Sequence, residues 1–217
     1  MENCRALGAK VKLSTHALFH DDYIHEGDDD EDTNDVGIRL LNCCTSAASL
    51  EVGLYATQEQ RLRGIVIIKG RVPRLPQVTS LVIHDRSFEL HSFGAGISDI
   101  LRQCCSLKYL RVYSTYSHNF KTKFRCDHPD RWNSDEVYLL PHLEEAEFTM
   151  LVGTDCEFRF MQSVLTNTRQ LRKATVSFNP HSLVNRVNAV EPIQPPGGGM
   201  WTSCDEAFSS FEWKPCL

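Results

Sequence analysis

The sequence predicts an α/β fold in which short parallel strands stack one after another and helices cover their outer side. Apolar residues recur at positions x, x+3 and x+5 in five segments of the chain. The alternation of x+3 with x+5 is typical of a strand with one buried face. Apolar residues at helical spacing precede two of these segments. A helix between two neighbouring strands forms a crossover connection, so the strands are expected to run parallel.

The five segments follow one template, the L-x-x-L-x-L skeleton of a leucine-rich repeat. Their residues at x, x+3 and x+5 are Leu62-Ile65-Ile67, Val78-Leu81-Ile83, Leu107-Leu110-Val112, Leu143-Ala146-Phe148 and Leu171-Ala174-Val176. We therefore expect a leucine-rich-repeat-like solenoid. It would be a partial horseshoe with parallel strands, helices on the outer side and irregular insertions.

Two helices are predicted before the strands that start near 107 and 171. Ile100–Val112 and Val164–Val176 align without a gap, which indicates a repeated unit of helix, turn and strand. Ser98-Asp99 and Thr154-Asp155 are candidate N-caps. The residues at helical spacing are Ile97, Ile100, Leu101 and Cys104 in the first helix, and Phe158, Met161, Val164 and Leu165 in the second.

The two ends of the chain carry weaker signals. Strands are expected within Ala6–Leu13 and Leu50–Leu54, and a helix at Val36–Cys44. The acidic segment His25–Asp35 favours a solvated loop over a cation site, because it lacks the spacing of an EF-hand. Proline and glycine after Val187 are typical of a linker. The last predicted feature is a tail that packs back on the fold through Phe208, Phe211 and Trp213.

Composition bounds the class of protein. The 217 residues carry a net charge of -5, without the basic stripe of a nucleic-acid binder. No apolar run is long enough for a membrane span, and the N-terminus lacks a secretory signal pattern. The nine cysteines include two adjacent pairs, Cys43-Cys44 and Cys104-Cys105. Adjacent cysteines do not suit a disulfide framework, so we expect reduced thiols, one of each pair in the core, and a cytoplasmic or nuclear location.

Catalytic, cofactor and metal sites are not expected. Gly94-Ala95-Gly96 could open a helix that binds phosphate, but Asp99 stands where a dinucleotide fingerprint needs its third glycine, so a tight turn is preferred. Cys126, His128 and Cys156 lack the paired short spacing of zinc ligands. No motif supplies a nucleophile, a base and an oxyanion site together, so the chain is not expected to be an enzyme.

The candidate site is a surface for an unknown protein partner. In a repeat fold of this kind the strands line a concave face, and residues between the buried positions point outward. The outward residues of the last three strands would form basic, acidic and basic patches, which suit a protein partner by charge complementarity. The candidate binding residues are Lys108, Tyr109, Arg111, Tyr113, Glu144, Glu145, Glu147, Arg172, Lys173 and Thr175.

The stretch Leu139–Phe178 resembles the FBD domain of plant F-box proteins. That family has a leucine-led strand, a Gly-x-acid turn, an apolar helix and a final strand, matched here by Leu143–Phe148, Gly153–Asp155, Phe158–Leu165 and Leu171–Val176. Leu75–His84, His91–Cys104, Cys126–Phe148 and Phe211–Cys216 are similar to repeats and an ending found in grass members of the family.

The resemblance implies the substrate-recognition region of an F-box subunit of an SCF-type ubiquitin ligase. No F-box segment is found, so direct docking to a cullin ligase is not expected. Three readings follow: a substrate adaptor; a truncated F-box-less relative that is inert or a competing binder; and, least favoured, a metal- or nucleotide-dependent enzyme. The expected organisation is degenerate repeats at 1–60 with the acidic loop at 25–35, leucine-rich repeats at 61–138 with an insertion at 114–135, an FBD-like unit at 139–186, and a linker and tail at 187–217.

Overall fold

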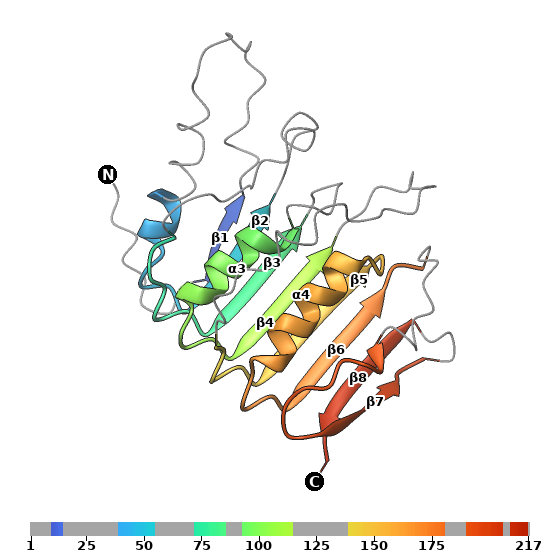
Figure 1. Cartoon of the computed structure of the whole chain (residues 1–217). Helices are drawn as coiled ribbons and strands as arrows, with labels where there is room; N and C mark the ends of the chain where they lie inside the picture. The colour runs from blue at the N-terminus through green and yellow to red at the C-terminus, as the bar shows by residue number, and fades with distance from the viewer. Residues whose placement is uncertain are drawn as a thin grey trace, which may run out of the picture.

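The described strands form one eight-stranded sheet with the order β1-β2-β3-β4-β5-β6-β8-β7 (Figure 1). This computed structural model describes residues 10–14, 39–54, 72–85, 93–114, 139–180, 190–205 and 209–216. The strands are β1 (Lys10–Ser14), β2 (Ser49–Leu54), β3 (Ser80–Asp85), β4 (Tyr109–Ser114), β5 (Glu145–Leu151), β6 (Lys173–Phe178), β7 (Gly199–Ser203) and β8 (Ser210–Pro215). The helices with labels are α3 (Phe93–Gln103) and α4 (Asp155–Thr166).

The first six strands run parallel and lie side by side in sequence order, which confirms the predicted α/β class and the parallel pairing. Their register follows the repeat template. One row of neighbours at position x+3 is Val11, Leu50, Leu81, Leu110, Ala146 and Ala174. The next row, at x+5, is Leu13, Val52, Ile83, Val112, Phe148 and Val176. The described members of both rows from β2 to β6 are buried, so the template identified the core face.

Four of the five predicted segments therefore form strands as expected, and Leu62-Ile65-Ile67 lies outside the described residues. One further segment fits the template but was not predicted from the sequence. Ala47, Leu50 and Val52 occupy x, x+3 and x+5, and all three are buried. The alanine at x hid this unit from a search for leading leucines and valines.

The buried spacing extends backwards from each strand in steps of three residues. Leu101, Cys104 and Leu107 are all buried, and the amides of Cys104 and Leu107 bond back to the carbonyls three residues earlier, at 3.1 and 3.2 Å. The same buried steps are Leu41, Cys44 and Ala47; Val72, Leu75 and Val78; Leu140 and Leu143; and Leu165, Thr168 and Leu171. The strands β2 to β6 are thus each preceded by side chains that enter the core at every third residue.

This spacing explains the paired cysteines. Cys44 and Cys104 occupy the same step before their strands and are buried, whereas Cys43 and Cys105 are exposed; all four are free thiols. Burial, together with repulsion from Cys105, raises the pKa of the Cys104 thiol to about 12. The prediction that one cysteine of each pair packs into the core is confirmed.

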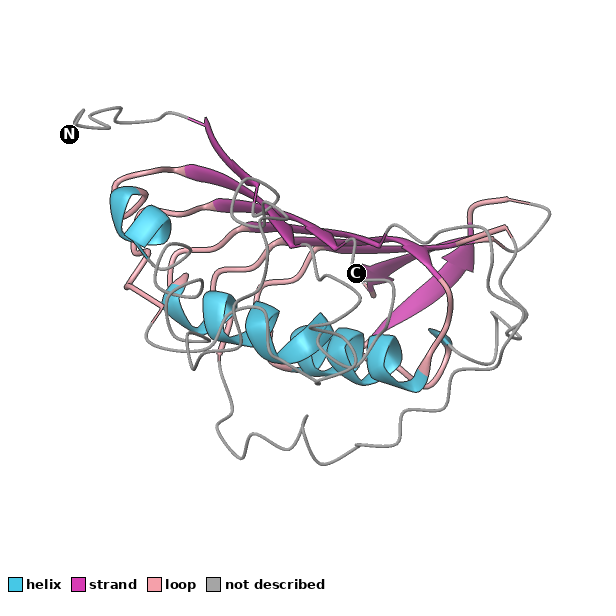
Figure 2. Cartoon of the chain, turned by 90° about the horizontal axis from the view of Figure 1, so that it is seen from above, coloured by secondary structure: helices cyan, strands magenta, loops and turns pink. Residues whose placement is uncertain are grey.

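Both labelled helices lie on the same side of the sheet, over its buried apolar face (Figure 2). Ile97, Ile100 and Leu101 of α3 point into the core. So do Met161, Val164 and Leu165 of α4, with Phe158 partly buried against it. Residues 39–43 are also helical, as expected for Val36–Cys44. In the ranges that the structure describes, no helix is long and apolar enough to cross a membrane.

The start of α3 was predicted wrongly. The helix begins at Phe93, so Gly94, Ala95 and Gly96 form its first turn and Ser98-Asp99 lies inside it. Asp99 pairs with Arg102 one turn later, at 3.1 Å, instead of capping the helix. Glycine has low helix propensity, which made the glycine-containing segment look like the turn before the helix.

The start of α4 was predicted correctly and is a capping box. The Thr154 hydroxyl accepts a hydrogen bond from the Glu157 amide at 3.3 Å. The Glu157 carboxylate accepts from the amides of Val152, Gly153 and Thr154 at 3.3, 2.7 and 2.9 Å. Gly153 has a φ of 89°, so the turn needs a residue without a side chain there. Glu157 is only 1% exposed, and these bonds satisfy both its charge and the free amides of the turn.

Replacing Glu157 by alanine should lower the free energy of unfolding by about 2–4 kcal/mol, because it leaves three partly buried amides without an acceptor. Urea denaturation of both proteins measures this loss. Thr154→Ala removes only one acceptor and should cost about 1 kcal/mol. Equal stability of Glu157→Ala and the parent protein would contradict the capping role.

The C-terminal segment completes the sheet with an antiparallel hairpin. β8 pairs with β6, and β7 pairs with β8, in both cases antiparallel. Phe211 and Trp213 are buried, which confirms that the tail packs back; Phe208 lies outside the described residues. The linker prediction is wrong for the described part, because Val190 and Ile193 are buried in the core. Two further features also lie outside the described residues: His25–Asp35, and all of the Ser114–Asp135 insertion except Ser114.

Candidate protein-binding face

The open face is the side of the sheet opposite α3 and α4 (Figure 2). On each strand it carries the residues that alternate with the buried rows, such as Tyr109, Arg111 and Tyr113 on β4. Each of the ten predicted binding residues lies on this face or immediately before one of its strands. The structure brings them together across β4, β5 and β6. Cross-strand neighbours are Tyr109, Glu145 and Lys173 in one row, and Arg111, Glu147 and Thr175 in the next.

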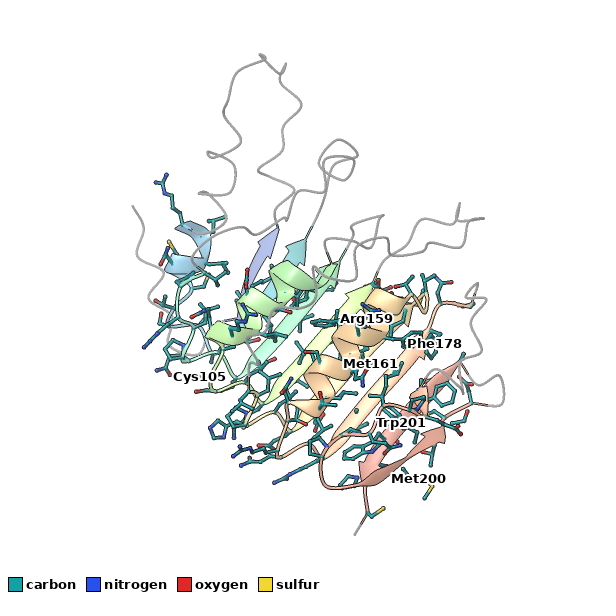
Figure 3. All side chains as sticks on the ribbon, in the orientation of Figure 1. Cys105, Arg159, Met161, Phe178, Met200 and Trp201 are labelled. Carbon is teal, nitrogen blue, oxygen red and sulfur yellow. The ribbon has the colours of Figure 1, made fainter. Side chains whose placement is uncertain are left out.

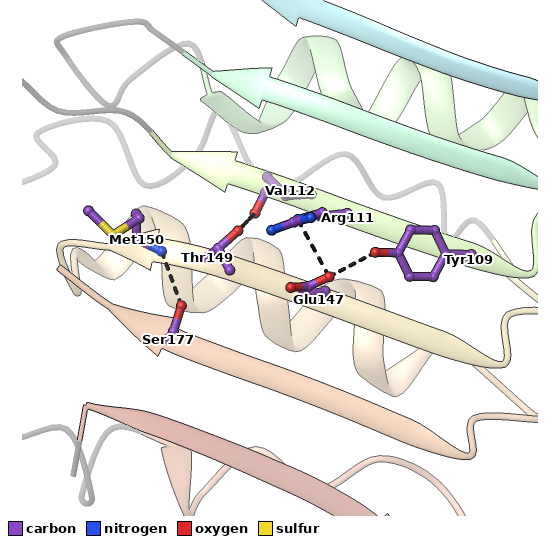
Figure 4. A network of polar contacts seen from close by, with 7 residues as sticks. All are labelled: Tyr109, Arg111, Val112, Glu147, Thr149, Met150 and Ser177. Atoms are coloured by element: carbon purple, nitrogen blue, oxygen red, sulfur yellow. Dashed lines mark hydrogen bonds and ion pairs between the residues drawn. The ribbon is translucent and has the colours of Figure 1, made fainter. Parts of the chain in front are cut away.

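The acidic side chains before and on β5 pair with basic side chains on both sides. Glu144 lies between Lys108 and Arg172, at 3.6 and 3.8 Å. Glu147 lies 3.4 Å from Arg111 and accepts a hydrogen bond from the Tyr109 hydroxyl at 2.7 Å (Figure 4). These groups are partly exposed, and such ion pairs contribute only about 0–1 kcal/mol each. The ion pairs therefore orient these side chains but add little to the stability of the fold.

β8 adds one further acidic residue to the open face, which was not predicted from the sequence. Glu212 lies 3.3 Å from both Lys173 and Lys214. Burial acts to raise the pKa of Glu212, but the hydrogen bonds and positive charge of the two lysines outweigh it and hold that pKa below its ordinary value. The alternation of buried Phe211 and Trp213 was the signal that could have placed Glu212 and Lys214 on the open face.

A second polar group on the open face lies on β2, β3 and β4. The His84 Nε2 atom is 3.1 Å from the Glu51 carboxylate, which is largely buried. The ring of Tyr113 lies beside the imidazole, with 5.8 Å between ring centres. Glu51 and His84 were not predicted from the sequence, because their pairing depends on the register between β2 and β3.

An irregularity in β5 shapes the open face near the C-terminal end of that strand. The register with β6 shifts between Phe148 and Leu151, and Met150 has a φ of 64°. The Met150 amide donates to the Ser177 hydroxyl at 3.4 Å (Figure 4). Thr149 donates from its hydroxyl to the Val112 carbonyl at 3.3 Å. A bulge of this kind increases the local twist and re-aims side chains at the end of a strand.

The ionisation of the Tyr109 phenol reports on the contacts made on this face. Burial raises its pKa most, and the hydrogen bond to Glu147 and the negative charge of that carboxylate raise it further, from 10.0 to about 12. The neutral phenol is therefore the form that the folded state favours. Its contribution to stability is complete below the unfolded pKa of about 10 and is lost as pH rises towards 12.

In an ultraviolet titration of the tyrosinate absorbance, one tyrosine should ionise near pH 12, and Tyr109→Phe should remove that step. Glu147→Gln should move the same step towards lower pH, because the amide is neutral. An unchanged late step in both variants would show that the tyrosine that ionises late is not Tyr109.

The face has the chemistry of a contact surface. The part of the chain that the structure describes holds no group of three or more His, Cys, Asp or Glu side chains that could bind a metal ion. Two of the weighed zinc ligands, Cys126 and His128, lie outside it, as does the side chain of Cys156. The open face carries tyrosines, charged pairs and hydroxyl groups, which can form hydrogen bonds and ion pairs. Comparison of this chain with family models, with curated proteins and with solved structures finds no match.

Proposed function

We propose that this chain is a non-catalytic protein-recognition module of the leucine-rich-repeat type, which binds an unknown protein substrate through its open face. The observation that carries the proposal is the row of parallel strands in one register, with both labelled helices on the opposite side. Folds in which successive units stack in this way use the strand side as an extended binding surface.

Further support comes from the last unit of the template. The leucine-rich consensus places Asn or Cys three residues after x+5. In the unit that starts at Leu171, this position is Asn179, which is largely buried. The backbone N–H of Asn179 donates to the Leu151 carbonyl of the preceding unit at 2.7 Å. A largely buried asparagine at this consensus position agrees with a repeat fold.

The chemistry of the face favours a partner that carries both signs of charge. Glu144 and Glu212 each pair with two cations already, and Glu147 pairs with Arg111. Because each exposed ion pair is weak, a charged side chain of the partner can replace one member of a pair at little cost in free energy. Tyr109 and Tyr113 lie among these charged residues and provide the aromatic area that protein interfaces concentrate at their centres.

By the resemblance to the FBD region of plant F-box proteins, the partner would be a ubiquitination substrate and the module a substrate adaptor in the cytosol or nucleus. The free thiols of Cys44 and Cys104 agree with a reducing compartment. Docking to a cullin ligase is no part of the proposal.

Affinity purification with charge-matched variants tests the proposal. Glu144→Lys changes the net charge by two and disrupts the open face, whereas Gln162→Lys with Thr166→Lys makes the same change at exposed positions of α4. Melting curves first establish that both proteins are folded. A specific partner should be retained by the α4 variant and its recovery should fall at least about tenfold with Glu144→Lys, as for a loss of more than 1 kcal/mol at an interface. Equal recovery with both variants, or no specific partner, would contradict the proposal.

A further inference from the structure

The two edges of the sheet differ in how they are protected. Among the described strands, β1 lies at one edge of the sheet and β7 at the other. β1 has the sequence KVKLS, with two lysines, while β7 has the sequence GMWTS, with no charged residue and no proline. Natural proteins commonly place lysine or proline on edge strands to prevent them from pairing with another chain. β7 lacks this protection.

The backbone of β7 presents free hydrogen-bonding groups on its outer side. The Cys204 amide donates to the Ser210 carbonyl at 2.9 Å, and Ser203 is the partner of Phe211 in the register. Since bonded and non-bonded pairs alternate in an antiparallel ladder, Met200 and Thr202 bond to β8. Gly199, Trp201 and Ser203 therefore direct their amides and carbonyls away from β8, and their backbone groups have no partner among the described residues.

The strand is accessible and held in place. Met200 is 64% exposed, and the two labelled side chains of the hairpin, Met200 and Trp201, lie at the end of the sheet (Figure 3). The Trp201 indole donates to the Ile193 carbonyl at 2.7 Å, which fixes the strand to the fold. Side-chain atoms placed on Gly197 or Gly198 would meet nothing within 4 Å, so the turn before β7 is open as well.

We propose that β7 pairs antiparallel with β7 of a second copy of this chain, about a two-fold axis at Trp201. In this register the outward groups of Trp201 bond to those of the second Trp201, and Gly199 bonds to Ser203. Met200 then lies opposite Thr202 of the other copy and becomes covered. The resulting contact is small, so the dimer belongs to the weak class of interfaces.

The charges beside the junction favour a second copy as the occupant. Lys214 is the β8 neighbour of Met200, and Glu212 is the neighbour of Thr202. Across the two-fold axis each row therefore runs Lys214, Met200, Thr202 and Glu212, with opposite charges at its two ends. The strands that meet are themselves uncharged, so no charge on one β7 faces a like charge on the other. This dimer does not depend on the proposed recognition function.

Sedimentation velocity over a range of protein concentrations tests the dimer. The parent chain should show a monomer–dimer equilibrium. Met200→Lys with Thr202→Lys places lysine opposite lysine twice and should raise the dissociation constant at least about tenfold relative to Met200→Glu with Thr202→Lys. Both variants change the same two exposed residues and lose the same Thr202 hydrogen bond to the Glu212 carbonyl, so they differ only in the charged residue at position 200.

Three results would overturn the self-pairing. The first is a parent chain that stays monomeric to the highest soluble concentration, which would leave β7 as an edge for a partner's strand only. The second is equal association of the two variants. The third is a dimer of unchanged affinity in the lysine–lysine variant, which would place the contact elsewhere on the molecule.

Discussion

Leu110→Asp should unfold the sheet. Leu110 is fully buried on β4 and lies in register between Leu81 and Ala146. Aspartate there must either bury an unpaired charge or draw water into the core between two strands. The expected loss exceeds about 4 kcal/mol, close to the whole stability of many domains. Circular dichroism should show no cooperative melting transition at 25 °C or above.

Leu139→Asp is the matched control, because it makes the same chemical change at a leucine that is 55% exposed. Its melting temperature should remain within a few degrees of the parent value, since surface substitutions usually change stability by less than about 0.5 kcal/mol. Similar melting of Leu110→Asp and Leu139→Asp would mean that the assigned strand register is wrong.

Trp213→Ala should cost about 3–5 kcal/mol, because it empties the space of the largest fully buried side chain. Trp213 lies on β8 beside the small Ala174 of β6, and its ring lies so close to Gly199 that no Cβ fits there. The indole therefore joins the C-terminal hairpin to the parallel strands. Urea denaturation of the purified variant measures the loss.

Trp213→Phe separates packing from hydrogen bonding. The Trp213 indole nitrogen is buried without a hydrogen-bond partner, so phenylalanine removes an unsatisfied donor and keeps most of the apolar contact. It should cost clearly less than alanine. If both variants were as stable as the parent chain, the hairpin would not be part of the cooperative core.

Much of the parallel sheet was predictable because burial repeats locally. Leu107, Leu110 and Val112 alternate as one face of a strand requires, and the same offsets in later segments fix which residues become neighbours. Ala47 shows the limit of this pattern, since a small residue at x carries little signal. The start of α3 was missed for a related reason: Gly94 and Gly96 are poor helix formers, and the packing of Ile97 and Ile100 overrides their propensity.

The C-terminal region depends on contacts that no local pattern contains. Pro195 and the glycines 197–199 read as a linker, yet Val190 and Ile193 are buried against the rest of the fold. For the same reason the sequence predicted Lys173 as a binding residue but not its partner Glu212, which reaches it only through the antiparallel pairing of β8. Side-chain alternation identified the open face, while the ion pairs across it required the strand order.

The most direct test of the account is site-specific photocrosslinking. A photoreactive phenylalanine at Tyr113 on the open face, and the same group at Gln162 on α4, are compared in extracts that contain the partner. A specific protein adduct is expected from position 113 and none from position 162. An adduct from position 162 alone would contradict the claim that this chain recognises its partner through the strand side of the sheet.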